Sequence, residues 1–256
     1  MTHAHSMKTA FITGASGGVA RALAHRLREQ GWRLVLVSRD TSRLDPGEHD
    51  VLVQTDVSTP GGAEAAFALA VDRTGQVPDA VVNCAGSTLI APLGRVTAEA
   101  FRSCMAANVD TAFFTVQAYT KALAAAGNRP GAIVLFSSVV AGLGVSNHAA
   151  IATAKGAIEA LVRSIAADFS HLGIRINAVA PGLMRSPMTE RMLVSERSQQ
   201  SVSAQYPLGH YGDAADGAAV AAWLLGPDAR WITGEVIHLD GGFSAVRPTV
   251  RSGATG

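Results

Sequence analysis

The stretch "KTAFITGASGGVA" (8–20) decides the fold of this chain. Its first half, 8–14, is a short apolar run that stops at a glycine, which predicts a β-strand. Its second half is a glycine-rich turn leading into a segment rich in Ala, Leu and Arg that ends at Gly31, which predicts a helix. A helix that begins at such a turn can hold a phosphate group at its N-terminus. Taken alone, the turn is equally typical of an ordinary strand–helix loop.

The rest of the chain repeats this alternation of short apolar runs and helix-length segments. Continuous apolar strands separated by helices predict a parallel sheet of about seven strands, covered on both faces and joined by right-handed crossovers. The sequence therefore predicts a doubly wound α/β fold. Further strands are expected at 33–39, 50–56, 79–86, 131–138, 174–182 and 235–242, and helices at about 61–73, 97–126, 148–170 and 213–225.

The domain organisation is expected to be simple. No linker or repeat divides the 256 residues, so a single domain over 1–256 is predicted. Residues 1–7 are interpreted as an N-terminal extension, and 247–256 as a mobile tail. Segment 183–210 is polar and irregular in pattern.

Charge and composition exclude several classes of function. The formal net charge is +1 and the basic residues are scattered, which argues against nucleic acid or an acidic membrane surface as a partner. No apolar run approaches the roughly 18 residues of a membrane span. Cys84 and Cys104 form neither a disulfide framework nor a metal-ligand spacing. We interpret them as reduced thiols, and we expect a cytoplasmic protein without a metal site.

The chemically interesting stretches all follow predicted strands. In a doubly wound fold, ligands bind in the crevice outside the carboxyl ends of the strands. This convergence predicts one ligand site at that edge of the sheet. The stretches are 14–20, 38–39, 56, 83–86, 137–138 and 181–188.

These motifs together resemble the short-chain dehydrogenase/reductase superfamily over about residues 8–245, and the resemblance implies a Rossmann fold. They are T-G-x-x-x-G-x-A at 13–20, Asp56-Val57, Asn83-Cys84-Ala85-Gly86, Asn108, Ser138, Lys155, Pro181-Gly182 and "ITGEVIHLDGG" at 232–242.

The resemblance implies a nicotinamide dinucleotide as cofactor. Asp56 would accept a hydrogen bond from the adenine amino group, and the 83–86 turn would lie along the adenosine ribose. The implied cofactor-binding residues are Gly14, Ser16, Gly17, Gly18, Val19, Ser38, Arg39, Asp56, Val57, Asn83, Ala85, Gly86, Lys155, Pro181 and Gly182.

Arg39 favours NADP over NAD, because a guanidinium matches the oxygens of a 2′-phosphate in bidentate geometry. An arginine that is simply solvated just past a strand remains the other interpretation. The next residue, Asp40, could pair with Arg39 or face the ribose itself, which would favour NAD.

The implied reaction site has a gap. In the family, a serine polarises the substrate carbonyl, a tyrosine exchanges the proton, and a lysine one turn later holds the nicotinamide ribose. Ser138 and Lys155 match, as does Asn108, which would hold a water that extends the proton path. Residues four apart share one face of a helix, so the tyrosine position is 151. That position holds isoleucine, which has no proton to give.

Two other side chains are candidates for the missing donor. His148, one turn before Ile151, could exchange a proton near neutral pH, or it could cap the helix or face solvent. Ser146 and Asn147 are expected as N-cap residues. Tyr206 lies in segment 183–210, which the resemblance implies is the substrate lid; it could reach inward, but we expect an exposed lid tyrosine.

The sequence thus predicts an NADP-dependent oxidoreductase that interconverts a carbonyl and an alcohol with an altered proton donor. One alternative is a catalytically silent NADP(H)-binding protein or structural subunit of the same fold. Another is an enzyme of non-redox chemistry, such as elimination or isomerisation. The resemblance also implies a small-molecule substrate and a homo-oligomer, tetramer or dimer, paired through the helices at 97–126 and 148–170.

Overall fold

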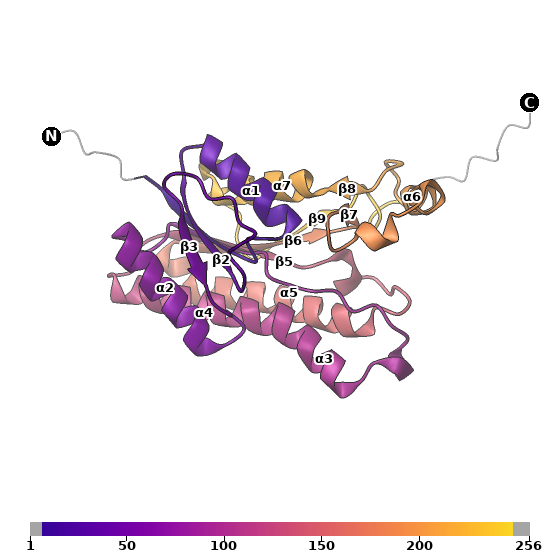
Figure 1. Ribbon diagram of the computed structural model, residues 1–256, viewed down its shortest axis with the longest axis horizontal. Helices are drawn as coiled ribbons and strands as arrows, with labels where there is room; N and C mark the ends of the chain where they lie inside the picture. Colours follow the sequence, from indigo (N-terminus) through magenta and orange to yellow (C-terminus); the bar gives the residue numbers. More distant parts are fainter. Residues whose placement is uncertain (1–6, 248–256) are drawn as a thin grey trace, which may run out of the picture.

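The computed structural model describes residues 7–247, and a seven-stranded parallel sheet forms its centre. The strands run in the order β3-β2-β1-β4-β5-β6-β9, so the chain starts in the middle of the sheet and builds outward in both directions (Figure 1). This arrangement confirms the predicted doubly wound α/β fold with seven strands. The strands are β1 (Thr9–Thr13), β2 (Arg33–Ser38), β3 (Val51–Gln54), β4 (Ala80–Asn83), β5 (Gly131–Phe136), β6 (Ile174–Pro181) and β9 (Val236–Leu239).

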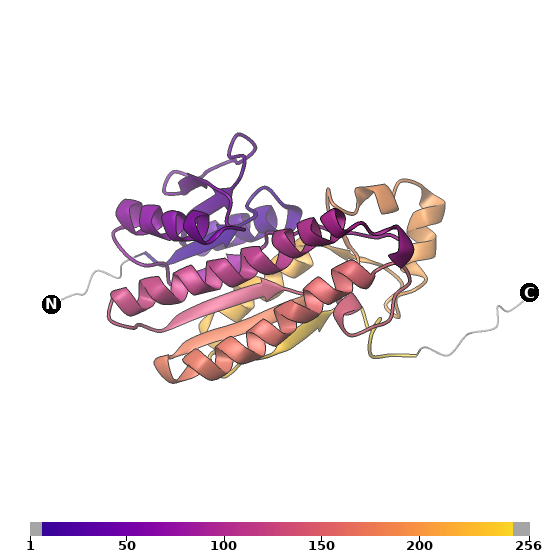
Figure 2. The same cartoon turned by 90° about the horizontal axis from the view of Figure 1, so that it is seen from below.

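Helices cover both faces of the sheet. Figure 1 shows α1 (Gly18–Glu29) and α7 (Ala214–Leu225) together on one face. The opposite face is covered by α2 (Pro60–Thr74), α4 (Thr111–Ala125) and α5 (Ala149–Phe169), and Figure 2 shows the last two lying side by side. Both faces are therefore buried, which explains why the strands are continuously apolar rather than alternating.

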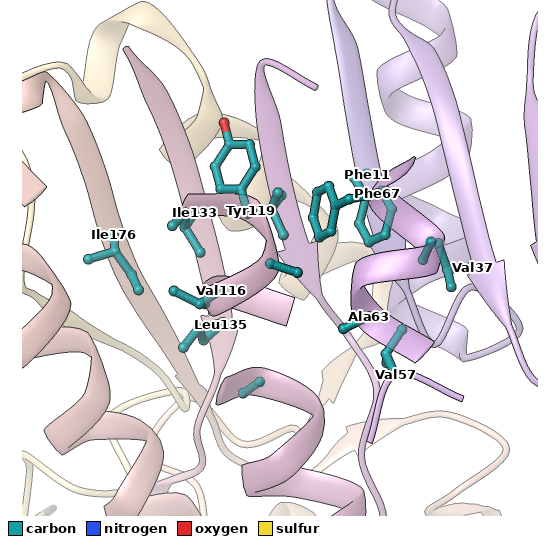
Figure 3. Packing of buried hydrophobic residues seen from close by; sticks show 14 of the residues in the cluster. Phe11, Val37, Val57, Ala63, Phe67, Val116, Tyr119, Ile133, Leu135 and Ile176 are labelled. Carbon is teal, nitrogen blue, oxygen red and sulfur yellow. The ribbon is translucent and has the colours of Figure 1, made fainter. Parts of the chain in front are cut away.

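An aromatic stack fills the core on the α2–α4 face. The rings of Phe11 on β1 and Phe67 on α2 lie 4.0 Å apart between centroids, and Tyr119 on α4 continues the stack at 5.7 Å (Figure 3). The buried hydroxyl of Tyr119 donates to the carbonyl oxygen of Pro78 at 3.0 Å, so its polar atom is satisfied. A Cβ at Gly131 would lie 2.3 Å from that hydroxyl, so β5 must begin with a glycine.

Two elements differ from their sequence-based description. The long helix expected at 97–126 is α3 (Ala98–Met105), a π-helical turn (Ala106–Asp110) and then α4. Segment 183–210 is not irregular throughout. It contains β7 (Met184–Arg185), which pairs with β8 (Gly212–Asp213), and α6 (Glu196–Ser203), which begins with a capping box between Ser195 and Ser198.

The predicted extension at 1–7 and tail at 247–256 lie outside the described residues, apart from Met7 and Arg247. Within 7–247, every helix is too short or too polar to cross a membrane. The same residues contain no group of three His, Cys, Asp or Glu side chains that could hold a metal ion.

Candidate functional site

The glycine-rich turn packs directly on the end of β4. Gly14 has a φ of +60°, and a Cβ there would lie 2.6 Å from the backbone nitrogen of Ala85. Any side chain at this position would therefore strain the backbone and collide with the neighbouring turn. Thr13 donates to the side-chain oxygen of Asn83 at 2.5 Å, which ties the ends of β1 and β4 together. Two turns that are far apart in sequence thus form one rigid edge.

The N-terminus of α1 is open to an anion. Its N-cap, Gly17, offers no side chain, and its first turn carries no acidic residue, so the first N–H groups are not satisfied within the helix. Ser16 lies in the turn before the helix, and Val19 lies in the first turn of the helix. A Cβ at Gly18 would meet the side chains of Ser186 and Pro187 at 3.3 Å. The segment after β7 therefore lies over the turn, a contact that the sequence did not predict.

Two residues of opposite charge, Arg39 and Asp40, follow the end of β2, and they do not pair with each other. Asp40 accepts hydrogen bonds from the backbone and hydroxyl of Ser42, which lower the pKa of its carboxyl, and it pairs with Arg43 at 3.5 Å. Arg39 is exposed and forms no ion pair with any residue of 7–247. The alternative of an Arg39–Asp40 pair is therefore not seen. Ser38, just before them, is buried and accepts from the backbone nitrogen of Asp40 at 3.3 Å.

Asp56 follows β3 at the same edge of the sheet. Its carboxylate accepts the backbone N–H of Ser58 at 2.9 Å, and this hydrogen bond holds the pKa of Asp56 below its usual range. The charge of Arg39 also lowers the pKa of Asp56. Val57, the next residue, is buried in the hydrophobic core that lies against α2 and α4.

Asn108 lies in the π-helical turn, a local geometry that often marks functional sites. It is 1% exposed, and its amide nitrogen donates to the carbonyl oxygens of Cys104 at 2.9 Å and Ser87 at 3.2 Å. Its side-chain oxygen has no hydrogen-bond partner among residues 7–247. A Cβ at Gly86 would lie 2.9 Å from that oxygen, so glycine keeps the space beside it open.

Lys155 on α5 reaches the same space. Its Nζ donates to the carbonyl oxygen of Phe136 at 2.8 Å and would lie 3.7 Å from a Cβ at Gly86. No carboxylate of residues 7–247 lies within 4.0 Å of it. Desolvation of the uncompensated ammonium lowers the pKa of Lys155 to about 8. A cation and an unsatisfied amide oxygen therefore converge beside Gly86.

Ser138 follows β5 at the neighbouring strand end. Its hydroxyl accepts from the backbone nitrogen of Val140 at 3.4 Å and donates to the carbonyl oxygen of Pro181 at 3.5 Å. Both contacts are long, so the hydroxyl is available to a ligand. The Pro181–Gly182 turn is held from the other side, where Gly182 N–H donates to Leu239 at 3.0 Å.

Ile151 occupies the position one turn before Lys155 as a packed core residue. It is 4% exposed and lies in a small apolar cluster with Cys104 of α3 and Ala154. Val140, two residues after Ser138, also packs against this cluster. The site therefore presents hydrocarbon where the resemblance implies a phenol.

The start of α5 corrects the N-cap prediction. Ser146 and Asn147 were expected to cap the helix, but the N-cap is His148, and its side chain makes no capping hydrogen bond. The ring Nδ1 lies 2.7 Å from the carbonyl oxygen of Ser146 instead. Asn147 adopts a left-handed conformation with a φ of +65°, which differs from the β-region backbone typical of an N-cap residue.

Tyr206 contradicts the expectation of an exposed lid tyrosine. It is 8% exposed, and its hydroxyl accepts the backbone N–H of Leu183 at 2.6 Å. Nothing in the local pattern of a polar segment distinguishes a buried tyrosine from an exposed one, since the contact spans 23 residues.

Residues 14–244 match a family model described as enoyl-(acyl carrier protein) reductase. The chain is 33% identical to a rat (3R)-3-hydroxyacyl-CoA dehydrogenase over 248 residues, covering 91% of this chain and 95% of that protein. It is 30% identical over 240 residues to the 3-oxoacyl-[acyl-carrier-protein] reductase FabG of Vibrio cholerae, with 92% and 96% covered. The structure of ElxO with NADP bound superimposes with a TM-score of 0.85 at 26% identity, covering 93% and 98% of the two chains.

Proposed function

The chain belongs to the short-chain dehydrogenase/reductase family of oxidoreductases, and we propose that it is an NADP-dependent enzyme that interconverts a carbonyl and an alcohol without a tyrosine as proton donor. The observation that carries this proposal is the convergence of Lys155 Nζ and the unsatisfied oxygen of Asn108 beside Gly86. A bound nicotinamide would supply or accept the hydride.

The residues at the strand ends fit a dinucleotide. The N-terminus of α1, with the nearby Gly14, Ser16, Gly17, Gly18 and Val19, would hold the pyrophosphate, because its first N–H groups are not satisfied within the helix and its N-cap makes no side-chain hydrogen bond. Ser38, Asp56, Val57 and the turn of Asn83, Ala85 and Gly86 would surround the adenosine half. Lys155, Pro181 and Gly182 would meet the nicotinamide half. Arg39, which lacks an anionic partner within 7–247, would bind the 2′-phosphate.

On the substrate side, the Ser138 hydroxyl would donate to the carbonyl oxygen, which increases the positive character of the carbon. Ile151 contributes apolar surface and no proton. His148, at the start of the same helix, remains a candidate donor through the ring nitrogen that does not face Ser146. The pKa of about 8 favours the Lys155 ammonium as a second candidate, because an acid is most effective when its pKa lies near the working pH.

Segment 183–210 is proposed as the substrate lid. Its start lies over the glycine-rich turn through Ser186 and Pro187. Met188 and Met192 are exposed on it, and flexible thioether side chains suit an apolar substrate wall. A small-molecule substrate enclosed between this segment and the strand ends would be shielded from water.

We also propose a homo-oligomer, dimer or tetramer, in the cytoplasm. Phe113 on α4 is 44% exposed, and Trp231 before β9 is 96% exposed. A second copy of the chain covering these rings would remove them from water. Light scattering at micromolar concentration should give a multiple of the 26.4 kDa chain mass, whereas the single mass would contradict this proposal. The two free cysteines support the reducing compartment.

The function is tested by binding and turnover measured separately. We expect NADPH to quench the tryptophan fluorescence of the protein at lower concentration than NADH does. Small ketones should be reduced slowly or not at all, as followed by the absorbance of NADPH. Turnover of any carbonyl in a panel of ketones, aldehydes and 3-oxoacyl thioesters supports the enzyme; binding without turnover across the panel supports the silent alternative. Failure to bind either dinucleotide would overturn the proposal.

The binding should also depend on pH through Lys155. Its pKa is lowered to about 8, so the ammonium that donates to ribose hydroxyls is lost as the pH rises through that value. We therefore expect NADPH affinity to fall between pH 7 and pH 9. Lys155→Met should remove this step, whereas Lys121→Met, on an exposed lysine paired with Glu64, should retain it.

A further inference from the structure

Tyr206 is buried, whereas most of the residues next to it in the sequence are exposed. Its ring packs on two glycines, because a Cβ at Gly182 would lie 2.8 Å from the ring and one at Gly241 would lie 3.6 Å from it. The ring of Phe243 lies 5.2 Å away between centroids. The aromatic side chain thus fills the space between the turn after β6 and the turn after β9.

The hydroxyl of Tyr206 adds a directional contact. It accepts the N–H of Leu183 at 2.6 Å, the residue directly after the Pro181–Gly182 turn. Burial raises the pKa of Tyr206, so the group stays a neutral phenol at physiological pH. The hydrogen bond from Leu183 to this hydroxyl is therefore expected to be independent of pH in the physiological range.

The residues after Tyr206 contact the turn that follows β9. Leu208 N–H donates to Gly241 at 3.2 Å, and Pro207 packs closely on Gly242. The turn that receives them is itself held by Asp240, whose carboxylate accepts the N–H groups of Gly242 and Ser244, both at 2.9 Å. Segment 206–208 is thus anchored to the ends of two strands.

We propose that Tyr206 is a positioning residue for the dinucleotide site: it holds the Gly182–Leu183 turn in place and anchors the C-terminal end of the lid. This inference rests on the proposed function, which puts the nicotinamide half of the dinucleotide beside that turn. Without the hydroxyl, the Leu183 N–H loses its acceptor, and the turn must be ordered when the ligand binds. The segment is held at both ends, at Leu183 by the Tyr206 hydroxyl and at Leu208 by Gly241.

The test compares two tyrosines of the same region. Tyr206→Phe keeps the ring and removes the hydroxyl that holds Leu183. Tyr211→Phe is the matched control, because within 7–247 the Tyr211 hydroxyl pairs only with the exposed side chain of Arg185. Each variant is titrated with NADPH and with adenosine 2′,5′-bisphosphate, which keeps the adenosine half and lacks the whole nicotinamide half. Hydrogen exchange of the Leu183 amide is measured in parallel.

Tyr206→Phe should weaken NADPH binding about fivefold and speed exchange at Leu183 by a similar factor, as expected for the loss of one hydrogen bond. Binding of adenosine 2′,5′-bisphosphate should change less than about twofold, because that ligand lacks the nicotinamide half and does not reach the turn. Tyr211→Phe should leave all three quantities unchanged. A purely structural role for Tyr206 would instead weaken both ligands equally.

Equal loss of both ligands, or identical behaviour of the two variants, would overturn the positioning role. If the parent binds neither ligand, the proposed function fails and the positioning role fails with it, while the exchange rate at Leu183 still reports whether Tyr206 holds the turn. Should Tyr206→Phe not fold, Phe243→Leu removes the aromatic neighbour of the Tyr206 ring outside the proposed binding residues and allows the same comparison.

Discussion

Replacing Ile151 with tyrosine should create or raise the reduction of small ketones by NADPH. The new phenol would lie one helical turn before Lys155 and near Val140, close to the Ser138 hydroxyl that would hold the carbonyl. A general acid in this place increases the rate by roughly 10²–10⁴. The neighbouring ammonium should lower the pKa of the phenol below about 10, which makes it a better donor at neutral pH. The measurement is the NADPH-dependent rate of parent and variant on the same ketones.

Packing determines how this experiment is controlled. Ile151 is 4% exposed against Cys104 and Ala154, and overpacking a core costs roughly 1–3 kcal/mol. Thermal unfolding and NADPH affinity must therefore be measured on the variant, and Cys104→Ala can be added to make room for the ring. Ile151→Phe is the matched control, since it adds the same ring without the hydroxyl. A parent protein as fast as the tyrosine variant would show that Ile151 is no handicap.

The same assay identifies the native donor. His148→Ala in the parent should lower any residual activity if the imidazole supplies the proton. It should leave the rate unchanged if the ring serves only the contact with Ser146. In that second case, an activity that falls as the pH rises above about 8, measured at saturating NADPH, would indicate Lys155.

Arg39→Asp should weaken NADPH binding strongly and change NADH binding little. A charge pair that is desolvated and hydrogen-bonded on binding typically loses a few kcal/mol when one partner is removed, which corresponds to about 100-fold in affinity. The carboxylate introduced would also repel the 2′-phosphate. Isothermal titration of both dinucleotides against parent and variant measures the effect.

The control for Arg39 is Arg73→Asp, which makes the same charge change at an exposed arginine near the end of α2. This variant should bind both dinucleotides as the parent does. Equal affinity of the parent protein for NADPH and NADH would contradict the role of Arg39. Asp40 would then be the residue to examine, although its carboxylate is already engaged by Ser42 and Arg43.

The sequence by itself determined the fold and most of the candidate site. Short continuous apolar runs predict the strands and longer segments between them predict the helices, and both are visible in short windows of sequence. The strict order of strands and helices then leaves few topologies, and the ends of parallel strands must meet at one edge. Gly14 and Ser138, which follow strands, could therefore be assigned to one edge before any distance was known. Asn108 and Lys155 lie on helices and were assigned to the site by the family resemblance, and the structure brings them together beside Gly86.

Contacts between distant elements were decided only by the tertiary structure. The burial of Tyr206 depends on Gly182 and Gly241, which belong to the ends of two other strands. The packing of Ile151 depends on Cys104, which comes from a different helix, and the π-helical turn at Asn108 has no local pattern that announces it. The carboxylate of Asp40 accepts a hydrogen bond from Ser42 and forms its ion pair with Arg43 rather than with the adjacent Arg39. Such choices depend on which surfaces meet once the elements are assembled, and no periodicity along the chain contains that information.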